Sequence, residues 1–330
     1  MKRTSDRLFV PGRVSVGICT LNRRDLAVRA IESVLSQTYR NVEVIVSDDA
    51  STDETAERVK QISDSRVKFF QQPIRLGVVE NPNFALQQAT GEFWMFVGDD
   101  DLLLPTAIEK LVTALLASSS VGVTWCPCRV ADRSGSGFWT TEAGSPRETV
   151  STMLSQLFAG NRGPRCSSVM IRTQAAIAVG GYEARYGDLS DIGNWGRAAL
   201  LYENAICIRE PLVQYTVHTG NMTARASAEQ WQEWAIKVHS DMIQLLDERG
   251  DRRSQNELIS AKSDLISGVT LTVLSLKIGK QGWIRETLLQ TIRTPGAIFT
   301  PYMFRRMVKD GAKVFTLLRS AQEEKARAKA

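Results

Sequence analysis

The sequence predicts an α/β protein built around a mostly parallel sheet. Short apolar and β-branched segments alternate with amphipathic segments, and the connections between them are short. This alternation is typical of βαβ units. One apolar run, at 93–97, is continuous rather than alternating, which favours a strand covered on both faces. That run leads directly into three adjacent carboxylates, Asp99, Asp100 and Asp101, at the strand end where open α/β sheets bind their ligands.

The elements can be predicted in chain order from periodicity and turn residues. Strands are expected at 14–19, 42–46, 67–70, 93–97, 121–125, 168–171, 205–208 and 212–216. Helices are expected with Leu26, Ala30, Ile31, Val34 and Leu35 on one face, and then at 83–90, 107–117, 153–158 and 195–201. A capping box at 51–54 predicts a further helix that buries Val59 and Ile62. The stretch 129–165 is rich in Gly, Ser, Pro and Arg and reads as a loop-rich insertion with one short helix.

The pattern changes after residue 225, which predicts an α/β domain over 1–225 and a helical region over 226–330. Trp231, Trp234, Ala235, Val238, Met242 and Leu245 share one helical face, and two or three more helices are expected up to about Leu318. Residues 277–330 hold twelve Lys or Arg against four Asp or Glu. The excess of positive charge therefore lies in this tail, and the rest of the chain is slightly acidic within the overall net charge of +5. Two readings of these basic helices are open: association with an anionic membrane surface, or a helical cap with a solvated basic face.

Composition narrows the class of protein and its compartment. No basic segment followed by an apolar core opens the chain, so no secretory signal is expected. The apolar segment near 265–276 is too short to span a bilayer. Five cysteines without a signal peptide indicate reduced thiols and a cytoplasmic protein. The basic residues are confined to the tail, which argues against nucleic-acid binding.

The three carboxylates after residue 97 have two explanations. Like charges brought together at a strand end repel one another unless a cation compensates them. A divalent metal that in turn holds phosphate oxygens would supply that cation. The alternative is an acidic turn that caps the helix predicted to begin near Pro105, since strand-to-helix turns favour Asp.

Several blocks, in order and spacing, resemble family 2 glycosyltransferases. They are 14–22, 33–39, 46–53, 91–92, 98–101 with Pro105, 180–182, Asp191 with Trp195, and 210–212 with Tyr215, His218 and Asn221. The resemblance covers roughly residues 12–225. It implies the GT-A fold, which is Rossmann-like, an inverting mechanism and a nucleotide-diphosphate sugar donor.

The resemblance implies donor-binding residues at the ends of the first two strands. Asp49 matches the family's Asp that accepts a hydrogen bond from the nucleotide base; the alternative is a charge at a helix N-terminus. Thr20 and Asn22 match the turn that touches base and ribose. Leu21 stands where the family usually has an aromatic residue, so uridine does not follow.

The resemblance also assigns the metal. The family motif is Asp-x-Asp, and counting back from Pro105 places its second Asp at Asp100 and its first at Gly98. Asp100 is therefore the expected ligand of Mg²⁺ or Mn²⁺, and Asp99 the expected contact to ribose or to a metal-bound water. Asp101 is assigned only a capping role for the following helix.

Asp191 is the expected general base, because it stands four residues before Trp195, as the family's acidic residue does. Asp188 is the reserve candidate. His218 resembles the family's His near the donor diphosphate, as a metal ligand or a hydrogen-bond donor. Arg23, Arg75 and Asn83 are further candidates for contacts to phosphate or sugar. His239 is expected at the surface.

The resulting expectation is a hexosyl- or deoxyhexosyltransferase. It would move a sugar to a hydroxyl of a glycan or lipid-linked acceptor in cell-surface polysaccharide synthesis, at the inner face of the membrane. The rival hypothesis is a non-catalytic nucleotide-binding or scaffold subunit of a glycan-assembly complex. Gly98 and Leu21 keep that hypothesis open, whereas a preserved Asp191 argues against it.

Overall fold

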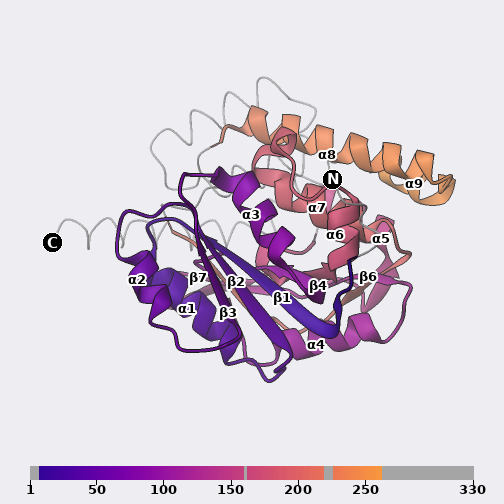
Figure 1. Ribbon diagram of the computed structural model, residues 1–330. Coiled ribbons are helices and arrows are strands. Elements are labelled where there is room, and N and C mark those ends of the chain that lie inside the picture. The colour runs from indigo at the N-terminus through magenta and orange to yellow at the C-terminus, as the bar shows by residue number, and fades with distance from the viewer. Residues whose placement is uncertain (1–6, 160–161, 219–225, 262–330) are drawn as a thin grey trace.

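The computed structural model describes residues 7–159, 162–218 and 226–261, and Figure 1 shows their arrangement. Its centre is an eight-stranded sheet with the order β3-β2-β1-β4-β10-β6-β11-β9. The strands β1, β2, β3 and β4 run parallel, β6 and β11 run parallel, and β10 and β9 are antiparallel to their neighbours. Their bounds are β1 Val10–Thr20, β2 Val42–Asp48, β3 Val67–Gln71, β4 Gly91–Phe96, β6 Val121–Trp125, β9 Arg147–Thr149, β10 Val169–Arg172 and β11 Asn204–Cys207.

A second, four-stranded sheet has the order β5-β12-β7-β8. Its strands are β5 Leu102–Leu103, β7 Cys128–Ala131, β8 Gly137–Thr140 and β12 Val213–Thr216. β5 pairs with β12 directly after the acidic run, and β12 leads to His218. This small sheet therefore brings the acidic run and His218 to the same edge of the molecule.

Helices cover both faces of the large sheet, as Figure 1 shows. Helices α1 (Arg24–Leu35), α2 (Thr55–Lys60) and α4 (Ala107–Leu116) lie on one face. The other face carries α3 (Gly77–Gln88), α5 (Val150–Phe158), α6 (Thr173–Ala178) and α7 (Ser190–Ala199). Two 3₁₀ turns, η2 (Cys166–Ser168) and η3 (Ala184–Leu189), connect elements near the site. The described chain ends with α8 (Ala228–Glu248) and α9 (Arg252–Ser260).

Strand β4 separates two hydrophobic cores because successive side chains of a strand point to opposite faces. Phe93 and Met95 belong to the core beneath α1 and α4, whereas Trp94 belongs to the core beneath α3 and α7. The indole of Trp94 lies across Gly17 of β1, where an added Cβ would stand 2.3 Å from the ring. A side chain at position 17 would therefore displace Trp94.

The predicted strands and the helix at 107–117 are found near their expected positions. Three expectations are wrong. Residues 129–165 contain the expected short helix, α5, but they also contribute strands to both sheets where a loop was expected. The capping box does not form: the N-cap of α2 is Glu54, without a side-chain cap, and Ser51 bonds Asp48 instead. Helix α3 begins at Gly77, six residues before the predicted start, and contains Pro82.

Helix α8 packs against η3 and α7, and its apolar face joins the same core as α5 and α7. His239 lies on the buried side of this helix, contrary to expectation: it is 1% exposed and its Nε2 hydrogen-bonds the carbonyl of Leu258 at 2.8 Å. The helices expected between 262 and Leu318 fall outside the described residues. Within the part of the chain that the structure describes, no helix has the length and apolar character needed to cross a membrane.

Candidate active site

The ends of three parallel strands bring the predicted residues to one edge of the sheet. β1 ends at Thr20, β2 ends at Asp48, and β4 leads to the acidic run. Arg23 follows β1 and reaches across this edge to the acidic run: its Nη1 lies 2.7 Å from Asp99 Oδ1 and 3.1 Å from Asp100 Oδ2. A guanidinium thus supplies the positive charge that the adjacent carboxylates require.

The three carboxylates of the acidic run have different surroundings. Burial raises the pKa of Asp99 to about 6, and the guanidinium of Arg23 opposes this rise. Of the two carboxylates that pair with Arg23, Asp100 has the more exposed side chain, at 14% against 7% for Asp99. Asp100 is therefore the carboxylate best placed to meet a ligand from solvent.

Asp101 turns inward and has no capping role, which corrects the expectation. Its Oδ2 accepts a hydrogen bond from the Ser167 hydroxyl, and its Oδ1 accepts one from the backbone N–H of Thr216 at 2.9 Å. The Ser167 hydroxyl also accepts from the backbone N–H of Gly98 at 2.9 Å. Burial, together with the charge of Asp100, raises the pKa of Asp101 to about 8. This side chain joins β4, η2 and β12 at the site.

His218 contacts the acidic run through one ring nitrogen and Arg133 through the other. Its Nε2 lies 2.9 Å from Asp100 Oδ2, and its Nδ1 lies 3.2 Å from Arg133 Nη2. A guanidinium only donates, so Nδ1 must be the acceptor and Nε2 carries the proton. In this arrangement neither nitrogen has a lone pair for a metal, and His218 acts as a hydrogen-bond donor.

Asp49 holds the start of α3. Its carboxylate accepts from the backbone N–H of Leu76 at 2.5 Å and of Gly77 at 3.0 Å, and the Nε of Arg75 lies 3.7 Å away. Asp49 thus has a helix N-terminal role, but at α3 and not at the helix that follows its own turn. A carboxylate has about four acceptor positions, so these bonds leave capacity for a nucleotide base.

The two asparagines among the candidates also stabilise local backbone. Asn22, with φ of 53°, accepts through Oδ1 from the backbone N–H of Thr52 at 2.8 Å. Asn83 uses both amide atoms on the backbone of Tyr182, at 2.8 and 2.9 Å. These bonds assign Asn83 to the turn before η3. Each amide atom keeps capacity for one more hydrogen bond, so a contact from Asn83 to the donor stays a prediction.

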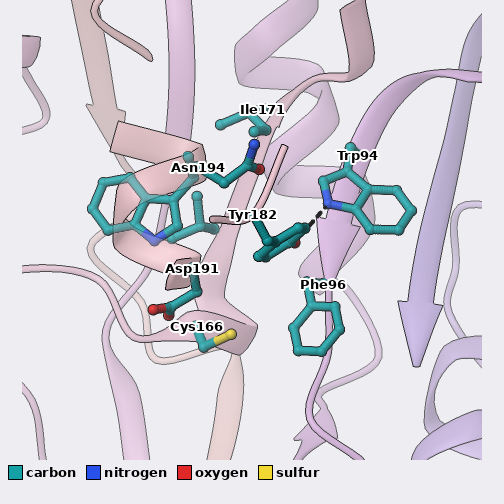
Figure 2. Close-up of a pocket in the computed structure, with 9 residues that line it drawn as sticks. Trp94, Phe96, Cys166, Ile171, Tyr182, Asp191 and Asn194 are labelled. Atoms are coloured by element: carbon teal, nitrogen blue, oxygen red, sulfur yellow. Dashed lines mark hydrogen bonds between the residues drawn. The ribbon is translucent and has the colours of Figure 1, made fainter. Parts of the chain in front are cut away.

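Asp191 lies in the first turn of α7 and lines a small, partly open cavity with eight other residues (Figure 2). Trp94, Phe96 and Tyr182 form aromatic walls, and the indole N–H of Trp94 donates to the Tyr182 hydroxyl at 3.1 Å. Burial raises the pKa of Asp191 to about 6, and the backbone N–H of Ile192 opposes the rise. Asp188, the reserve candidate, is at the end of η3 and is not among the cavity's lining residues.

Sequence reasoning missed Arg133, Cys166 and Ser167. All three come from the stretch that was read as a loop insertion or from its end, where no motif marks them. Their importance is visible only once β7, β10 and η2 place them beside residues from distant strands. By contrast, the turn in which the Tyr182 backbone binds Asn83 has a sequence signal, because Gly180 and Gly181 precede it.

The described residues contain no group of three His, Cys, Asp or Glu side chains arranged to hold a metal ion. The donor set still fits a divalent cation that takes most of its ligands from elsewhere. Mg²⁺ is commonly bound through one or two carboxylates plus substrate phosphates and waters. Asp100, with Asp99 beside it, offers that chemistry once Arg23 moves aside.

Comparisons with known proteins agree with this geometry. The sequence model described as "Glycosyl transferase family 2" matches residues 15–177. A Campylobacter jejuni protein, "GalNAc(5)-diNAcBac-PP-undecaprenol beta-1,3-glucosyltransferase", is 41% identical over 103 residues, which are 30% of this chain and 33% of that protein. The chain spans about a third of the length of the first curated relatives it matches.

Solved structures show the same fold. S. aureus TarS 1–349, in complex with UDP-GlcNAc, aligns with a TM-score of 0.58 at 18% identity and covers 96% of this chain and 92% of its own. The mannosyltransferase PcManGT from Pyrobaculum calidifontis, in complex with GDP-Man and Mn²⁺, aligns with a TM-score of 0.51 at 17% identity, over 95% and 88% of the two chains. The fold is therefore the GT-A fold expected from the sequence. Through residues 15–177, the chain belongs to glycosyl transferase family 2.

Proposed function

We propose that the protein is an inverting glycosyltransferase that moves a sugar from a nucleotide-diphosphate donor to a hydroxyl group of a glycan or lipid-linked acceptor. The supporting observation is the connection between the acidic run and Asp191. Cys166 lines the same cavity as Asp191, and the next residue, Ser167, donates to Asp101. Two adjacent residues thus lie beside a candidate base and a candidate diphosphate site, which are the two groups that direct sugar transfer needs.

The donor site is proposed at the ends of β1, β2 and β4. Thr20, Asn22 and Asp49 would contact the nucleoside, since they surround the turns after β1 and β2. Arg23, His218 and Asp99 would contact the diphosphate or ribose. Arg23 and the Nε2–H of His218 both point to Asp100, so both can donate to phosphate oxygens that arrive there.

A divalent cation, Mg²⁺ or Mn²⁺, would be held by Asp100, with Asp99 as a direct or water-mediated contact. It would neutralise charge that develops on the leaving diphosphate. Cationic side chains of the protein would also offset the charge on the leaving diphosphate. Arg23 is paired with two carboxylates in this structure, and it becomes available to phosphate when another cation takes its place.

Asp191 would act as the general base. The acceptor hydroxyl oxygen forms a bond to the anomeric carbon while the bond from that carbon to the diphosphate oxygen breaks. The hydroxyl proton passes to Asp191, and the nucleoside diphosphate leaves with the electron pair. A pKa of about 6 suits this task, because the carboxylate is ionised at neutral pH yet more basic than an exposed Asp.

The acceptor and the location are proposed from the relatives' chemistry. The Campylobacter jejuni protein named above acts, by its name, on an undecaprenol-linked glycan. An acceptor of that class would be a growing surface polysaccharide on a lipid carrier, and the protein would work at the cytoplasmic face of the membrane. The basic region 277–330 would contribute to that association.

The substitution Asp191→Asn separates this proposal from the scaffold alternative. Purified protein would be incubated with tritiated nucleotide sugars and with membranes from the source organism, and label in the lipid extract would be counted. Loss of a positioned base typically costs 10²- to 10⁴-fold in rate. Transfer should fall by about that factor while nucleotide binding by calorimetry persists. Transfer at the wild-type rate by the variant would remove Asp191 from the mechanism, and transfer by neither protein with any donor would favour the scaffold.

A further inference from the structure

The 3₁₀ turn η3 leads into α7, and so to Asp191, through a glycine with an unusual backbone conformation. Gly187 has φ of 49° and ψ of −129°, which interrupts the helical path inside η3. Glycine reaches this region at little steric cost because it has no Cβ. The bend lies four residues before Asp191, so its geometry determines where the first turn of α7 begins.

The indole ring of Trp234, from α8, covers this bend. A Cβ added at Gly187 would stand 2.1 Å from Cε2 of Trp234, so the ring lies directly against the glycine backbone. Trp234 also faces Trp231 of the same helix, with 6.4 Å between the ring centroids. A helix from beyond residue 225 therefore packs on the segment that positions Asp191.

Asp241, two helical turns after Trp234, binds two other residues of η3. Its Oδ2 accepts a hydrogen bond from the Tyr186 hydroxyl at 2.7 Å and lies 3.2 Å from Nη1 of Arg185. Residues seven positions apart share one face of a helix, so Trp234 and Asp241 hold η3 along a single face of α8. Figure 1 shows α8 next to α7, which it also contacts.

Tyr186 connects this face of α8 to α7. Its side chain is fully buried, and a Cβ added at Gly193 would stand 2.3 Å from its ring. The guanidinium of Arg197 lies 5.1 Å from the centroid of the same ring, and its Nη1 pairs with Glu183 at 2.5 Å. Gly193 follows Asp191 by two residues on α7, so a displacement of Tyr186 would move the turn that carries Asp191.

We infer that α8 holds the candidate base in place through η3, with Trp234 and Asp241 as positioning residues. Neither of them is among the residues that line the cavity beside Asp191. The catalytic meaning of this link rests on the proposed function, whereas the link itself can be measured without any substrate.

The first test measures amide hydrogen exchange of the full-length protein by peptide mass spectrometry. In Asp241→Ala, Tyr186 and Arg185 lose their common partner, so peptides that cover 184–194 should exchange about tenfold faster than in wild type. Peptides that cover the acidic run are the internal reference and should exchange as in wild type. Tyr186→Phe is a milder change that removes only the hydroxyl, and it should act in the same direction.

Glu233→Ala is the matched control, because Glu233 is a carboxylate of the same helix that pairs with Lys237 at the surface. Exchange at 184–194 should stay within about twofold of wild type in this variant. Equal exchange in Asp241→Ala and Glu233→Ala would overturn the inference. Exchange that accelerates equally at 184–194 and in the acidic run, in both Asp241→Ala and Tyr186→Phe, would show a loss of overall stability and would overturn it as well.

The second test asks whether Asp241 acts through Asp191. Initial transfer rates would be measured at varied donor concentration in Asp241→Ala, in Asp191→Asn and in the double variant. A misplacement of about 1 Å can cost about 100-fold in rate, so Asp241→Ala should lower kcat by about 10- to 100-fold and leave the KM for the donor within about twofold. In the Asp191→Asn background the same substitution should cost less than about threefold, because no base remains to be misplaced.

The double variant distinguishes positioning from general stability. Equal losses of kcat on adding Asp241→Ala to wild type and to Asp191→Asn would assign Asp241 to stability alone and overturn the positioning role. Absence of transfer by wild type with any donor would contradict the proposed function, and the exchange result would then decide the link between α8 and η3 by itself.

Discussion

Arg23 occupies the position in which a divalent cation would act, and this has a measurable consequence. Its Nη1 bridges Asp99 and Asp100, whose side chains are only 7% and 14% exposed. A metal that binds Asp100 must therefore displace the guanidinium or share the carboxylates with it. The substitution Arg23→Gln removes the competing charge and keeps a polar side chain of similar length. We expect the variant to bind Mn²⁺ more tightly than wild type when no nucleotide is present.

The size of the effect follows from the two contacts. A hydrogen bond to a charged group contributes about 1.5–3 kcal/mol. Arg23 is 25% exposed, so water replaces part of what is lost, and we take the lower value for the pair as a whole. About 1.5 kcal/mol corresponds to roughly tenfold tighter binding of Mn²⁺. Binding of a nucleotide diphosphate should weaken in the same variant, since the phosphates lose a donor.

The measurement is electron paramagnetic resonance of free Mn²⁺ in a titration of full-length protein. It should be done at pH 8, because Arg23 lowers the pKa of Asp99 and its loss would otherwise let a proton replace the guanidinium. Arg24→Gln is the control: Arg24 is the next residue, and within the part of the chain that the structure describes its ion pairs are with the exposed carboxylates of Asp25 and Glu54. Mn²⁺ affinity that is equal or weaker in Arg23→Gln than in wild type would refute the reasoning.

Three further outcomes concern stability, each measured by urea unfolding of the full-length protein. The pKa of Asp191 is about 6 in the folded protein, against the ordinary value of 3.8 expected in the unfolded chain. The folded state therefore binds the proton more tightly, and the contribution of Asp191 to stability decreases as pH rises from about 4 to 6. Asp191→Asn should therefore stabilise the fold at pH 8, by at most about 3 kcal/mol, and should show less effect at pH 4; destabilisation at pH 8 would contradict this. Asp101→Ala leaves the backbone N–H of Thr216 without its acceptor and should cost about 1–3 kcal/mol; unchanged stability would mean that the buried bonds are replaced by water. Gly17→Ala places a Cβ against the ring of Trp94 and should cost about 1–3 kcal/mol, and a neutral result would show that the ring shifts freely.

Much of the large sheet could be predicted because its signals are local. The apolar run of β4 is continuous and β1 and β2 are rich in β-branched residues, while the helices between them have periodic apolar faces that need no distant partner to be recognised. The order of the strands and the antiparallel direction of β10 are not local properties. Both depend on which strands pair with one another across the sheet, and so they can be seen only in the folded chain.

The errors have the same physical origin. The strands β7, β8 and β9 are three or four residues long and carry polar residues. They are stabilised by pairing with β12, β7 and β11, respectively, rather than marked by their own pattern. His239 looked like a surface residue on its helix, but the position of α9 buries it and the Leu258 carbonyl satisfies its ring. Ser51 has the right spacing for a capping box, yet its hydroxyl bonds the Asp48 carboxylate instead.

The same difference between local signals and long-range contacts applies to the candidate site. Motif spacing was enough to bring Arg23, Asp99, Asp100 and His218 together, and the structure places them in contact. It was not enough to show that Asp101 points inward or that Cys166 lines the same cavity as Asp191. Those arrangements join residues 65 or more positions and 25 positions apart, respectively, and they depend on the path of η2.

The most direct test of the account is nucleotide binding by calorimetry. UDP, dTDP, CDP and GDP would be titrated into wild type and Asp100→Ala, each with and without Mn²⁺. The account predicts that one nucleotide binds wild type, that Mn²⁺ strengthens this binding, and that Asp100→Ala loses the strengthening. Binding that ignores both Mn²⁺ and the substitution would contradict the role of Asp100, and the absence of binding by all four would contradict the proposed donor site.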